Sequence, residues 1–218
     1  MKYGFIFDFD GTVADSGDGI VSAVLEVYKG NGMPAPSKEF LHRQIGLPAQ
    51  ALFPGVEGPE LDGFIELFRE FLTTDLAASR ISFPGVGITL KTLHQMGHQI
   101  AIATSKPHRL IKQIVADWEY SNFLAWVQGV DGFPPKPDPE VILRCQKKLD
   151  AKKYVMVGDR PEDMIAGKRA SCFCIGITQG YSSSSELDSS GADIVYDSIV
   201  SLYEDLDNLV GLLEKSDR

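Results

Sequence analysis

The chain opens with YGFIFDFDGT (residues 3–12), an apolar run that stops at two acidic residues and a glycine. The aromatic and β-branched residues of Tyr3–Phe7 favour a strand, and Asp-Gly after such a run is typical of a turn. Asp8 and Asp10 lie two apart, so in an extended chain their side chains point the same way, while Phe9 points into the core. Taken alone, such a strand end is more often an ordinary turn than a site.

Five later segments share the character of this first strand, being short, apolar and mostly continuous rather than alternating. Strands of that kind are typical of a parallel sheet covered on both faces. We expect them at Gln99–Thr104, Ala125–Gln128, Tyr154–Val157, Cys172–Ile177 and Asp193–Tyr196. Helical periodicity lies between them, as in residues 110–118 and 199–213. The alternation predicts an α/β fold with a doubly wound, Rossmann-like parallel sheet.

Residues 16–82 break this alternation. Helical periodicity runs through residues 20–28 and 61–72 without a convincing strand, and turn-rich stretches separate the helices. We interpret the segment as an α-helical cap domain inserted after the first strand. The predicted division is a catalytic core of residues 1–15 and 83–218 with a cap of residues 16–82.

Polar side chains follow four of the predicted strands, and ligands of an open parallel sheet bind beyond the carboxyl ends of its strands. Converging carboxylates would repel one another and raise their own pKa values unless a cation lay among them. Mg²⁺ suits such a place because it accepts carboxylate and phosphate oxygens together. Lysine and hydroxyl groups would then hold the remaining phosphate oxygens. The acidic candidates are Asp8, Asp10, Asp159 and Asp163, and the phosphate-binding candidates are Thr104, Ser105 and Lys136.

The bulk composition narrows the class of partner and the compartment. A formal net charge of -9, without a Lys and Arg cluster, argues against a nucleic-acid partner. No stretch approaches the ~20 apolar residues of a membrane span, and the N-terminus lacks the form of a secretory signal. Three cysteines give no disulfide framework. We expect a cytoplasmic monomer or homodimer that binds neither nucleic acid nor membrane.

The cysteines and histidines are expected to be ordinary core or surface residues. Cys172 and Cys174 alternate with apolar residues in a predicted strand, so we expect them to be small buried residues rather than a metal or redox pair. His94, His98 and His108 stand in polar helix or loop contexts, so we expect them at the surface.

Four motifs occur in one order along nearly the whole chain: DFDGT at 8–12, TSK at 104–106, Lys136 before Pro-Asp-Pro, and Gly-Asp at 158–159. In this the sequence resembles the haloacid dehalogenase superfamily, in particular its phosphatases with a helical cap after the first strand. Within them the pattern is most similar to the phosphoglycolate phosphatase group. The resemblance implies hydrolysis of a small phosphorylated metabolite.

The resemblance also implies a two-step reaction and a role for each matching residue. Asp8 attacks phosphorus to form an aspartyl-phosphate, and Asp10 protonates the leaving oxygen and then activates water. Mg²⁺ is held by the side chains of Asp8 and Asp159 and the backbone carbonyl of Asp10, with Asp163 in support. The transferring phosphoryl group is bound by Thr104 and Lys136.

The sequence departs from the family pattern after the second acidic motif. Arg160 and Pro161 stand where many relatives carry a small polar residue after Gly-Asp. The metal ligand Asp159 is unaffected, so the departure concerns secondary contacts only.

Substrate choice is expected to lie in the cap, which closes over the leaving group and excludes water. The residues we expect there are Arg43, Gln44, Ile45, Gly46 and Leu47. The same stretch is also typical of a helix end and a turn between helices.

Several alternative functions remain open on the sequence. A pyrophosphatase and a β-phosphoglucomutase-like phosphosugar mutase would share the core motifs. A dehalogenase needs neither Asp10 nor the acidic cluster, so these residues argue against it. A phospho-accepting signalling receiver also uses an acidic pocket on a doubly wound sheet, but as a compact domain of ~120 residues without such an insertion.

Overall fold

A computed structural model of the protein describes residues 2–74 and 80–215 and is built around a parallel sheet of six strands. The strand order is β3-β2-β1-β4-β5-β6, so the chain winds outward from β1 in both directions. The strands are β1 (Tyr3–Phe7), β2 (Gln99–Pro107), β3 (Trp126–Val130), β4 (Lys153–Gly158), β5 (Phe173–Ile177) and β6 (Ile194–Tyr196). This confirms the predicted α/β fold class.

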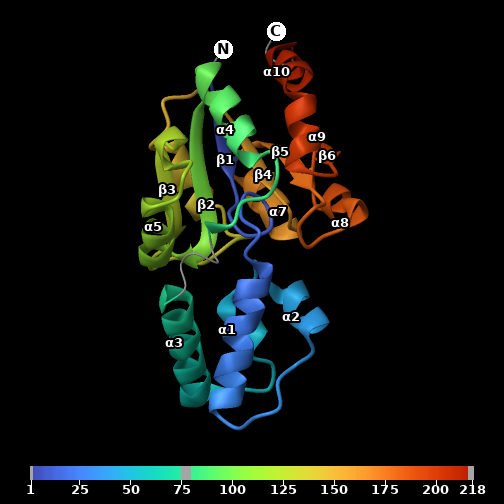
Figure 1. The fold of residues 1–218 in the computed structure, drawn as a ribbon. Coiled ribbons are helices and arrows are strands. Elements are labelled where there is room, and N and C mark those ends of the chain that lie inside the picture. The colour runs from blue at the N-terminus through green and yellow to red at the C-terminus, as the bar shows by residue number, and fades with distance from the viewer. Residues whose placement is uncertain (1, 75–79, 216–218) are drawn as a thin grey trace.

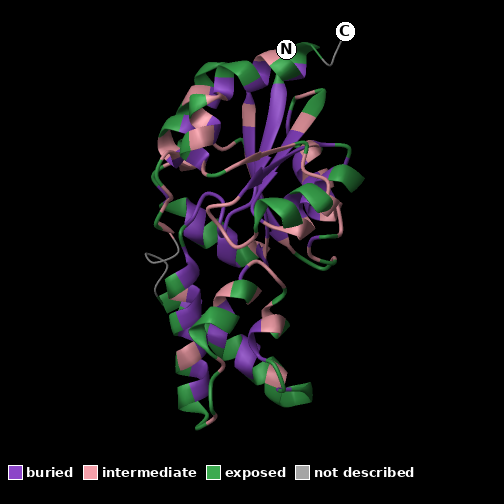
Figure 2. Cartoon of the chain, turned by 90° about the vertical axis from the view of Figure 1, so that its right-hand side faces the viewer, coloured by how far each residue is buried: buried purple, intermediate pink, exposed green. Residues whose placement is uncertain are grey.

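Helices cover both faces of the sheet because successive strand residues point to opposite sides. Phe5 and Phe7 join one buried cluster and Ile6 joins the other. The helices of the first cluster are α4 (Val86–Gln95), α5 (His108–Ala116), α9 (Ile199–Glu204) and α10 (Leu206–Lys215), and those of the second are α6 (Glu140–Gln146), α7 (Pro161–Arg169) and α8 (Ser184–Ser189). Figure 2 shows the strands buried between them.

The chain between β1 and β2 forms a separate group of helices. They are α1 (Gly17–Gly30), α2 (Lys38–Gln44), the 3₁₀ turn η1 (Ala49–Leu52) and α3 (Gly58–Thr74). Tyr28, Phe53 and Phe64 pack edge-on or tilted, with ring centroids 5.7 to 5.8 Å apart. Figure 1 places these helices below the carboxyl ends of the strands, opposite to both termini. Within the described ranges no helix has the length and apolar character to cross a membrane.

Two chain crossings join the helical group to the sheet, and they run side by side. Ala14 and Ser82 form an antiparallel bridge. The Asp15 amide donates to the Ile81 carbonyl at 2.7 Å, and the Phe83 amide donates to the Val13 carbonyl at 3.3 Å. The division into core and cap at residues 15–16 and 82–83 stays a prediction, and these positions lie next to the bridge. Residues 1, 75–79 and 216–218 of the predicted core and cap lie outside the described residues.

Two details differ from expectation. The second strand runs on to Pro107, which pairs with Val130 after an irregularity beyond Ala103, so the TSK motif lies within the end of the strand rather than after it. His98 is buried, and the prediction that it lies at the surface was wrong: the turn at Gly97 places it beside the first strand, where its Nδ1 accepts from the Tyr3 amide at 3.2 Å.

The cysteine prediction was correct. Cys172 lies just before β5 and Cys174 lies within it, and both are small buried residues of the core. Burial raises the pKa of each thiol to about 12.

Candidate active site

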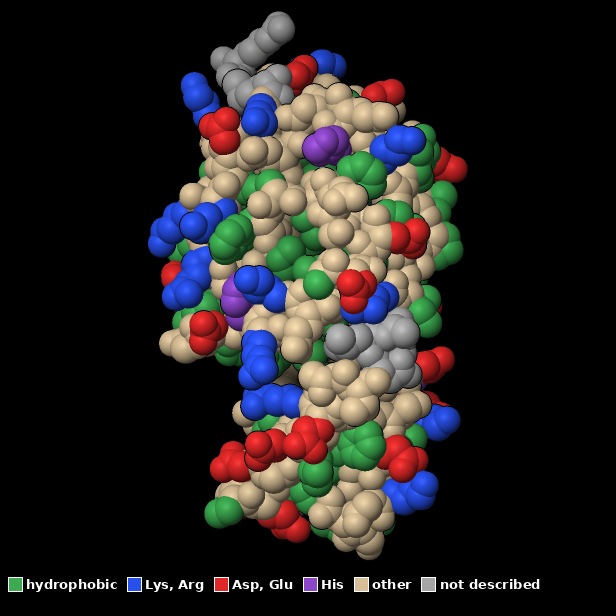
Figure 3. Space-filling model, turned by 60° about the vertical axis from the view of Figure 1, so that its left-hand side comes forward, with side chains coloured by type: hydrophobic (Ala, Val, Ile, Leu, Met, Phe, Trp, Pro, Cys, Tyr) green, Lys and Arg blue, Asp and Glu red, His purple; other side chains and the backbone are tan. Residues whose placement is uncertain are grey.

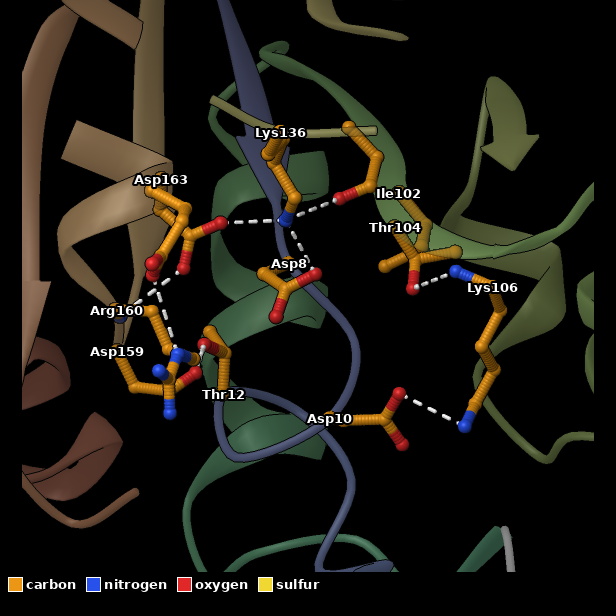
Figure 4. A network of polar contacts seen from close by, with 12 residues as sticks. Asp8, Asp10, Thr12, Ile102, Thr104, Lys106, Lys136, Asp159, Arg160 and Asp163 are labelled. Atoms are coloured by element: carbon orange, nitrogen blue, oxygen red, sulfur yellow. Dashed lines mark hydrogen bonds and ion pairs between the residues drawn. The ribbon is translucent and has the colours of Figure 1, made fainter. Parts of the chain in front are cut away.

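Asp8 and Lys136 form the centre of the site at the carboxyl end of β1. The Asp8 amide donates to the Val157 carbonyl of β4 at 2.8 Å, which fixes the residue at the middle of the sheet. The Lys136 ammonium donates to Asp8 Oδ1 at 2.6 Å, to the Ala103 carbonyl at 3.1 Å and to Asp163 Oδ1. Figure 4 shows Lys136 between the two carboxylates. Its three donors are therefore all used, and the lysine side chain is only 3% exposed.

Asp159 and Asp163 complete a buried acidic cluster with Asp8. One carboxylate oxygen of each lies within 4.8 Å of the others, and all three residues are buried. Asp159 is held by the Thr12 hydroxyl, which donates to Oδ1 at 2.8 Å, and by the Tyr181 amide, which donates to Oδ2 at 3.1 Å. The three residues offer the oxygen donors that a hard divalent cation prefers, so they could hold one.

Three ionised carboxylates buried in one place would be electrostatically unfavourable. Burial raises the pKa of Asp8 to about 7, the Lys136 ammonium opposes this rise, and the Asp163 and Asp10 carboxylates add to it. Burial also raises the pKa of Asp159 well above its ordinary value, with further contributions from Asp163 and Asp8. For Lys136, burial lowers the pKa but the neighbouring carboxylates of Asp163 and Asp8 outweigh it, so the pKa is raised and the ammonium is retained. A further cation would relieve this repulsion.

Asp10 lies on the opposite side of Asp8 from this cluster and has its own partners. Its carboxylate accepts from the Ser16 hydroxyl and forms an ion pair with the Lys106 ammonium, Nζ to Oδ2 at 2.8 Å. Both side chains of that pair are less than a tenth exposed. Figure 4 shows Asp10 turned towards Lys106 and away from Asp159. The Asp10 carboxylate is thus paired with Lys106 and Ser16 and is not a member of the acidic cluster.

The hydroxyl groups of the TSK motif lie beside Asp8 as well. Thr104 is buried, and its Oγ1 accepts from the Lys106 amide at 3.2 Å. The Ser105 Oγ is buried without a hydrogen-bond partner. Both residues line the cavity above Asp8. An unpaired buried hydroxyl is costly, so Ser105 is suited to donate to a bound anion.

A cavity of about 580 Å³ lies between the sheet and the helical group. The sheet contributes Asp8, Asp10 and the TSK motif, and the helical group contributes Gln44, Ile45, Gly46, Leu47, Ile20, Leu52, Phe68, Arg69 and Leu72. Arg43 does not line the cavity and is exposed. The turn after α2 therefore reaches the cavity, while the last but one residue of α2 lies outside it.

A groove of mixed charge adjoins the cavity. Arg69 lines both the cavity and this groove, which also contains Arg109 and the acidic residues Asp62, Glu66 and Glu70. Figure 3 shows basic side chains gathered at the junction of the two parts, with acidic side chains below them. The groove beside the cavity is therefore mixed in charge, and Arg69 is the cationic residue that the helical group contributes to the cavity lining.

Three residues that contact the acidic side chains or line the cavity had no role predicted from the sequence. Lys106 belongs to the TSK motif. It is the second residue after Thr104, and on an extended chain two such side chains point to the same side, which was the available indication that Lys106 reaches the site. Tyr181 stands 22 residues after Asp159 and contacts it through its amide. Arg69 lies on an exposed helix position of α3. Nothing in the local sequence distinguishes Tyr181 or Arg69 from ordinary loop and surface residues.

Comparison with known proteins gives consistent matches over most of the chain. The sequence model of the family described as haloacid dehalogenase-like hydrolase matches residues 5–177. The phosphoglycolate phosphatase of Vibrio cholerae is 32% identical over 212 residues, covering 91% of this chain and 94% of that protein. The phosphoglycolate phosphatase of Pseudomonas putida is 29% identical, covering 90% and 77%. The crystal structure of a hydrolase from Pseudomonas syringae, 25% identical, has a TM-score of 0.79 and covers 94% of this chain and 98% of that one.

Proposed function

We propose that this chain, which belongs to the haloacid dehalogenase-like hydrolase family and is a phosphatase, hydrolyses a small anionic phosphomonoester of the phosphoglycolate type with Asp8 as the nucleophile. The observation that carries this proposal is the placement of Asp8 in hydrogen-bond contact with Lys136 and beside the Asp159 and Asp163 carboxylates, on the lining of a cavity of about 580 Å³. The relatives named phosphoglycolate phosphatase support the substrate class.

In the first step, an Asp8 carboxylate oxygen attacks phosphorus while the bond from phosphorus to the leaving oxygen breaks. Asp10 gives its proton to that oxygen, so an alcohol leaves and an aspartyl-phosphate remains. The Lys136 ammonium and the Thr104 and Ser105 hydroxyl groups offset charge on the phosphoryl oxygens. The Lys106 ammonium, 2.8 Å from Asp10 Oδ2, orients the Asp10 carboxyl group.

In the second step, water attacks phosphorus and the bond from phosphorus to the Asp8 oxygen breaks. Asp10, now deprotonated, takes the proton of the water, which restores both carboxyl groups and releases inorganic phosphate. The same side chain thus acts as acid and then as base, so a single turnover resets it. Closure of the cavity by the helical group keeps bulk water out during the first step.

We propose that the metal is Mg²⁺, held by the carboxylates of Asp8 and Asp159 and the backbone carbonyl of Asp10, with Asp163 in support. The donors are oxygens only and three of the side chains are buried together; burial, with the neighbouring carboxylates adding to it, raises the pKa of Asp8 and of Asp159. When bound, Mg²⁺ supplies charge neutralisation between the nucleophile and the phosphate.

Mg²⁺ should stabilise the protein more at about pH 8 than at about pH 5. The raised pKa of Asp8, about 7 against an ordinary 3.8, means that the folded metal-free protein favours the protonated form. The contribution of Asp8 to the stability of the metal-free fold is therefore fully present below the ordinary pKa of the carboxyl group. That contribution is lost as pH rises towards about 7. Mg²⁺ requires the ionised form, so at about pH 8 and about 100 times its Kd it should add about 2.7 kcal/mol, or roughly 5–10 °C in Tm.

Thermal melts with and without Mg²⁺ at the two pH values test this expectation. The Asp150→Asn variant is the control, because that carboxylate is 93% exposed and lies in an ion pair with Lys2. It should keep the full difference between the two pH values. Equal stabilisation at both would contradict a site built from Asp8 and Asp159.

We further propose that residues 16–82 act as a cap over a core of residues 1–15 and 83–218, and that Gln44, Ile45, Gly46 and Leu47 select the leaving group. Their place in the cavity lining supports this role. Arg43 is exposed, so its part in selection is limited to its backbone.

A panel of phosphorylated compounds tests the proposed function. With Mg²⁺ present, the protein should release many phosphates per molecule, and kcat/KM for phosphoglycolate should exceed that for hexose phosphates by roughly tenfold or more, since the Arg69 side chain of the cavity lining offers a cation to an anionic leaving group. Preferred hydrolysis of pyrophosphate in the same panel would support the pyrophosphatase alternative. Transfer of phosphate between positions of a sugar would support the mutase. A single phosphate per protein molecule would instead support a receiver and overturn the proposal.

A further inference from the structure

Arg160, the residue at which the sequence departs from the family pattern, occupies a joint between the acidic cluster and the cap. It follows Asp159 directly and is the N-cap residue of α7. Its backbone amide donates to Asp163 Oδ2 at 3.1 Å, so its main chain belongs to the acidic loop. Figure 4 shows it beside Asp159 and Asp163.

The side chain of Arg160 leaves the sheet and reaches the end of α2. Its Nη1 donates to the Arg43 carbonyl at 3.1 Å and to the Ile45 carbonyl at 3.0 Å. Its Nε donates to Glu162 Oε2 at 3.2 Å, and the side chain as a whole is only 11% exposed. Carbonyl groups at a helix C-terminus lack partners within the helix and favour a cation, so the guanidinium satisfies both needs.

Gly46 provides the space for this contact. Its φ is +86°, and a Cβ there would lie 2.6 Å from the Arg160 Cδ. A side chain at position 46 would therefore displace the arginine as well as strain the backbone. The same turn, Gln44 to Leu47, lines the cavity above Asp8.

We infer that Arg160 is a positioning residue that docks the turn formed by Gln44 to Leu47 over the catalytic cavity. One residue thereby links the loop that holds the acidic cluster to the part of the cap that faces the leaving group. The inference deepens the proposed function, on which its kinetic test rests.

A second contact between core and cap limits what loss of Arg160 would do. The Tyr181 hydroxyl lies beside Gly17 at the start of α1, where it would be 2.9 Å from a Cβ, and the His42 ring of α2 approaches the same point. This side of the joint does not involve Arg160. Removal of the arginine should therefore loosen the turn at 44–47 without freeing the whole cap.

The kinetic test compares Arg160→Met, which keeps a long side chain without donors, with Arg144→Met as the matched control. Arg144 pairs with Glu140 on α6, in the core and outside the cavity lining. For phosphoglycolate, Arg160→Met should raise KM roughly 10- to 100-fold and change kcat much less, because the groups that react with phosphorus are untouched. Arg160→Lys retains one donor group and should recover part of the loss. A fall in kcat alone, with KM unchanged, would overturn the inference.

Hydrogen exchange gives a readout that needs no substrate. The Ile45 and Leu47 amides donate to the carbonyls of His42 and Gln44 at 3.3 and 3.1 Å. Their exchange should be roughly tenfold faster in Arg160→Met, intermediate in Arg160→Lys and unchanged in Arg144→Met, while α7 stays protected. Unchanged exchange at 45–47 would overturn the inference, as would equal acceleration in α7, which would assign Arg160 to its own helix. If the wild type released no phosphate, the proposed function would fail and exchange would still decide the role of Arg160.

Discussion

Asp8→Asn should abolish phosphate release, lowering kcat by roughly 10⁴-fold or more, since it removes the atom proposed to bond to phosphorus. The amide oxygen can still accept from Lys136, which donates to Asp8 Oδ1 at 2.6 Å, so the surroundings should hold their arrangement. Phosphate release with saturating phosphoglycolate and Mg²⁺ measures the loss. Activity within about tenfold of the wild type would remove Asp8 from the mechanism.

The stability of the same variant separates loss of chemistry from loss of fold. Asn at position 8 carries no charge, and the Asp8 carboxylate is buried beside two other carboxylates. At about pH 8 the metal-free variant should therefore melt at or above the wild-type temperature. Asp150→Asn, at an exposed carboxylate, should leave both turnover and melting unchanged.

The fold was predictable because its strands are buried on both faces and so read as continuous apolar runs. Each predicted strand overlaps an observed one, and β1 matches at both ends. The proximity of Asp8, Thr104 and Asp159 could be expected for the same reason, since the carboxyl ends of parallel strands meet at one edge. The helices between β1 and β2 could be expected from their periodicity, while their division from the core as a cap stays a prediction. The bridge between Ala14 and Ser82 is a contact that a pattern of single residues does not reveal.

Contacts between distant segments were the part that sequence could not supply. The TSK motif drew attention to Lys106, but its pairing with Asp10 depends on how β2 ends beside the loop after β1. His98 looked polar and exposed, and it is buried because the register of β1 and β2 brings it against Tyr3. Arg160 could be recognised as a departure, yet its partners are carbonyl groups 115 and 117 residues away. A backbone carbonyl acceptor cannot be recognised from residue types, because every residue carries one.

The site combines two ion pairs that assign different tasks to its two lysines. Lys136 lies deep between Asp8 and Asp163, where its charge offsets the acidic cluster. Lys106 pairs with Asp10 and lines the cavity. Because Asp10 has its own cation and is turned away from the cluster, one strand end holds two carboxyl groups in different surroundings, as the proposed roles of nucleophile and acid require.

Lys136→Met should lower kcat by roughly 10³-fold or more, because the lysine is the buried cation that the proposed mechanism places on the phosphoryl oxygens. It should also destabilise the metal-free protein by roughly 3–5 kcal/mol, the usual cost of removing one partner from a buried ion pair. The raised pKa of Lys136 keeps it charged, so this contribution is present throughout the neutral range and is lost only in strong alkali. Turnover and thermal melts measure the two effects.

The loss of stability in Lys136→Met should grow as pH rises above about 7, because the Lys136 ammonium opposes the rise in the pKa of Asp8, and without it the buried carboxyl group beside Asp163 ionises only at a higher pH. Lys168→Met is the matched control: its ammonium pairs with Asp193 and its side chain is 41% exposed, so both turnover and the pH dependence should stay at wild-type values. A Lys136→Met protein that melts like the wild type at about pH 8 would show that the acidic cluster needs no internal cation.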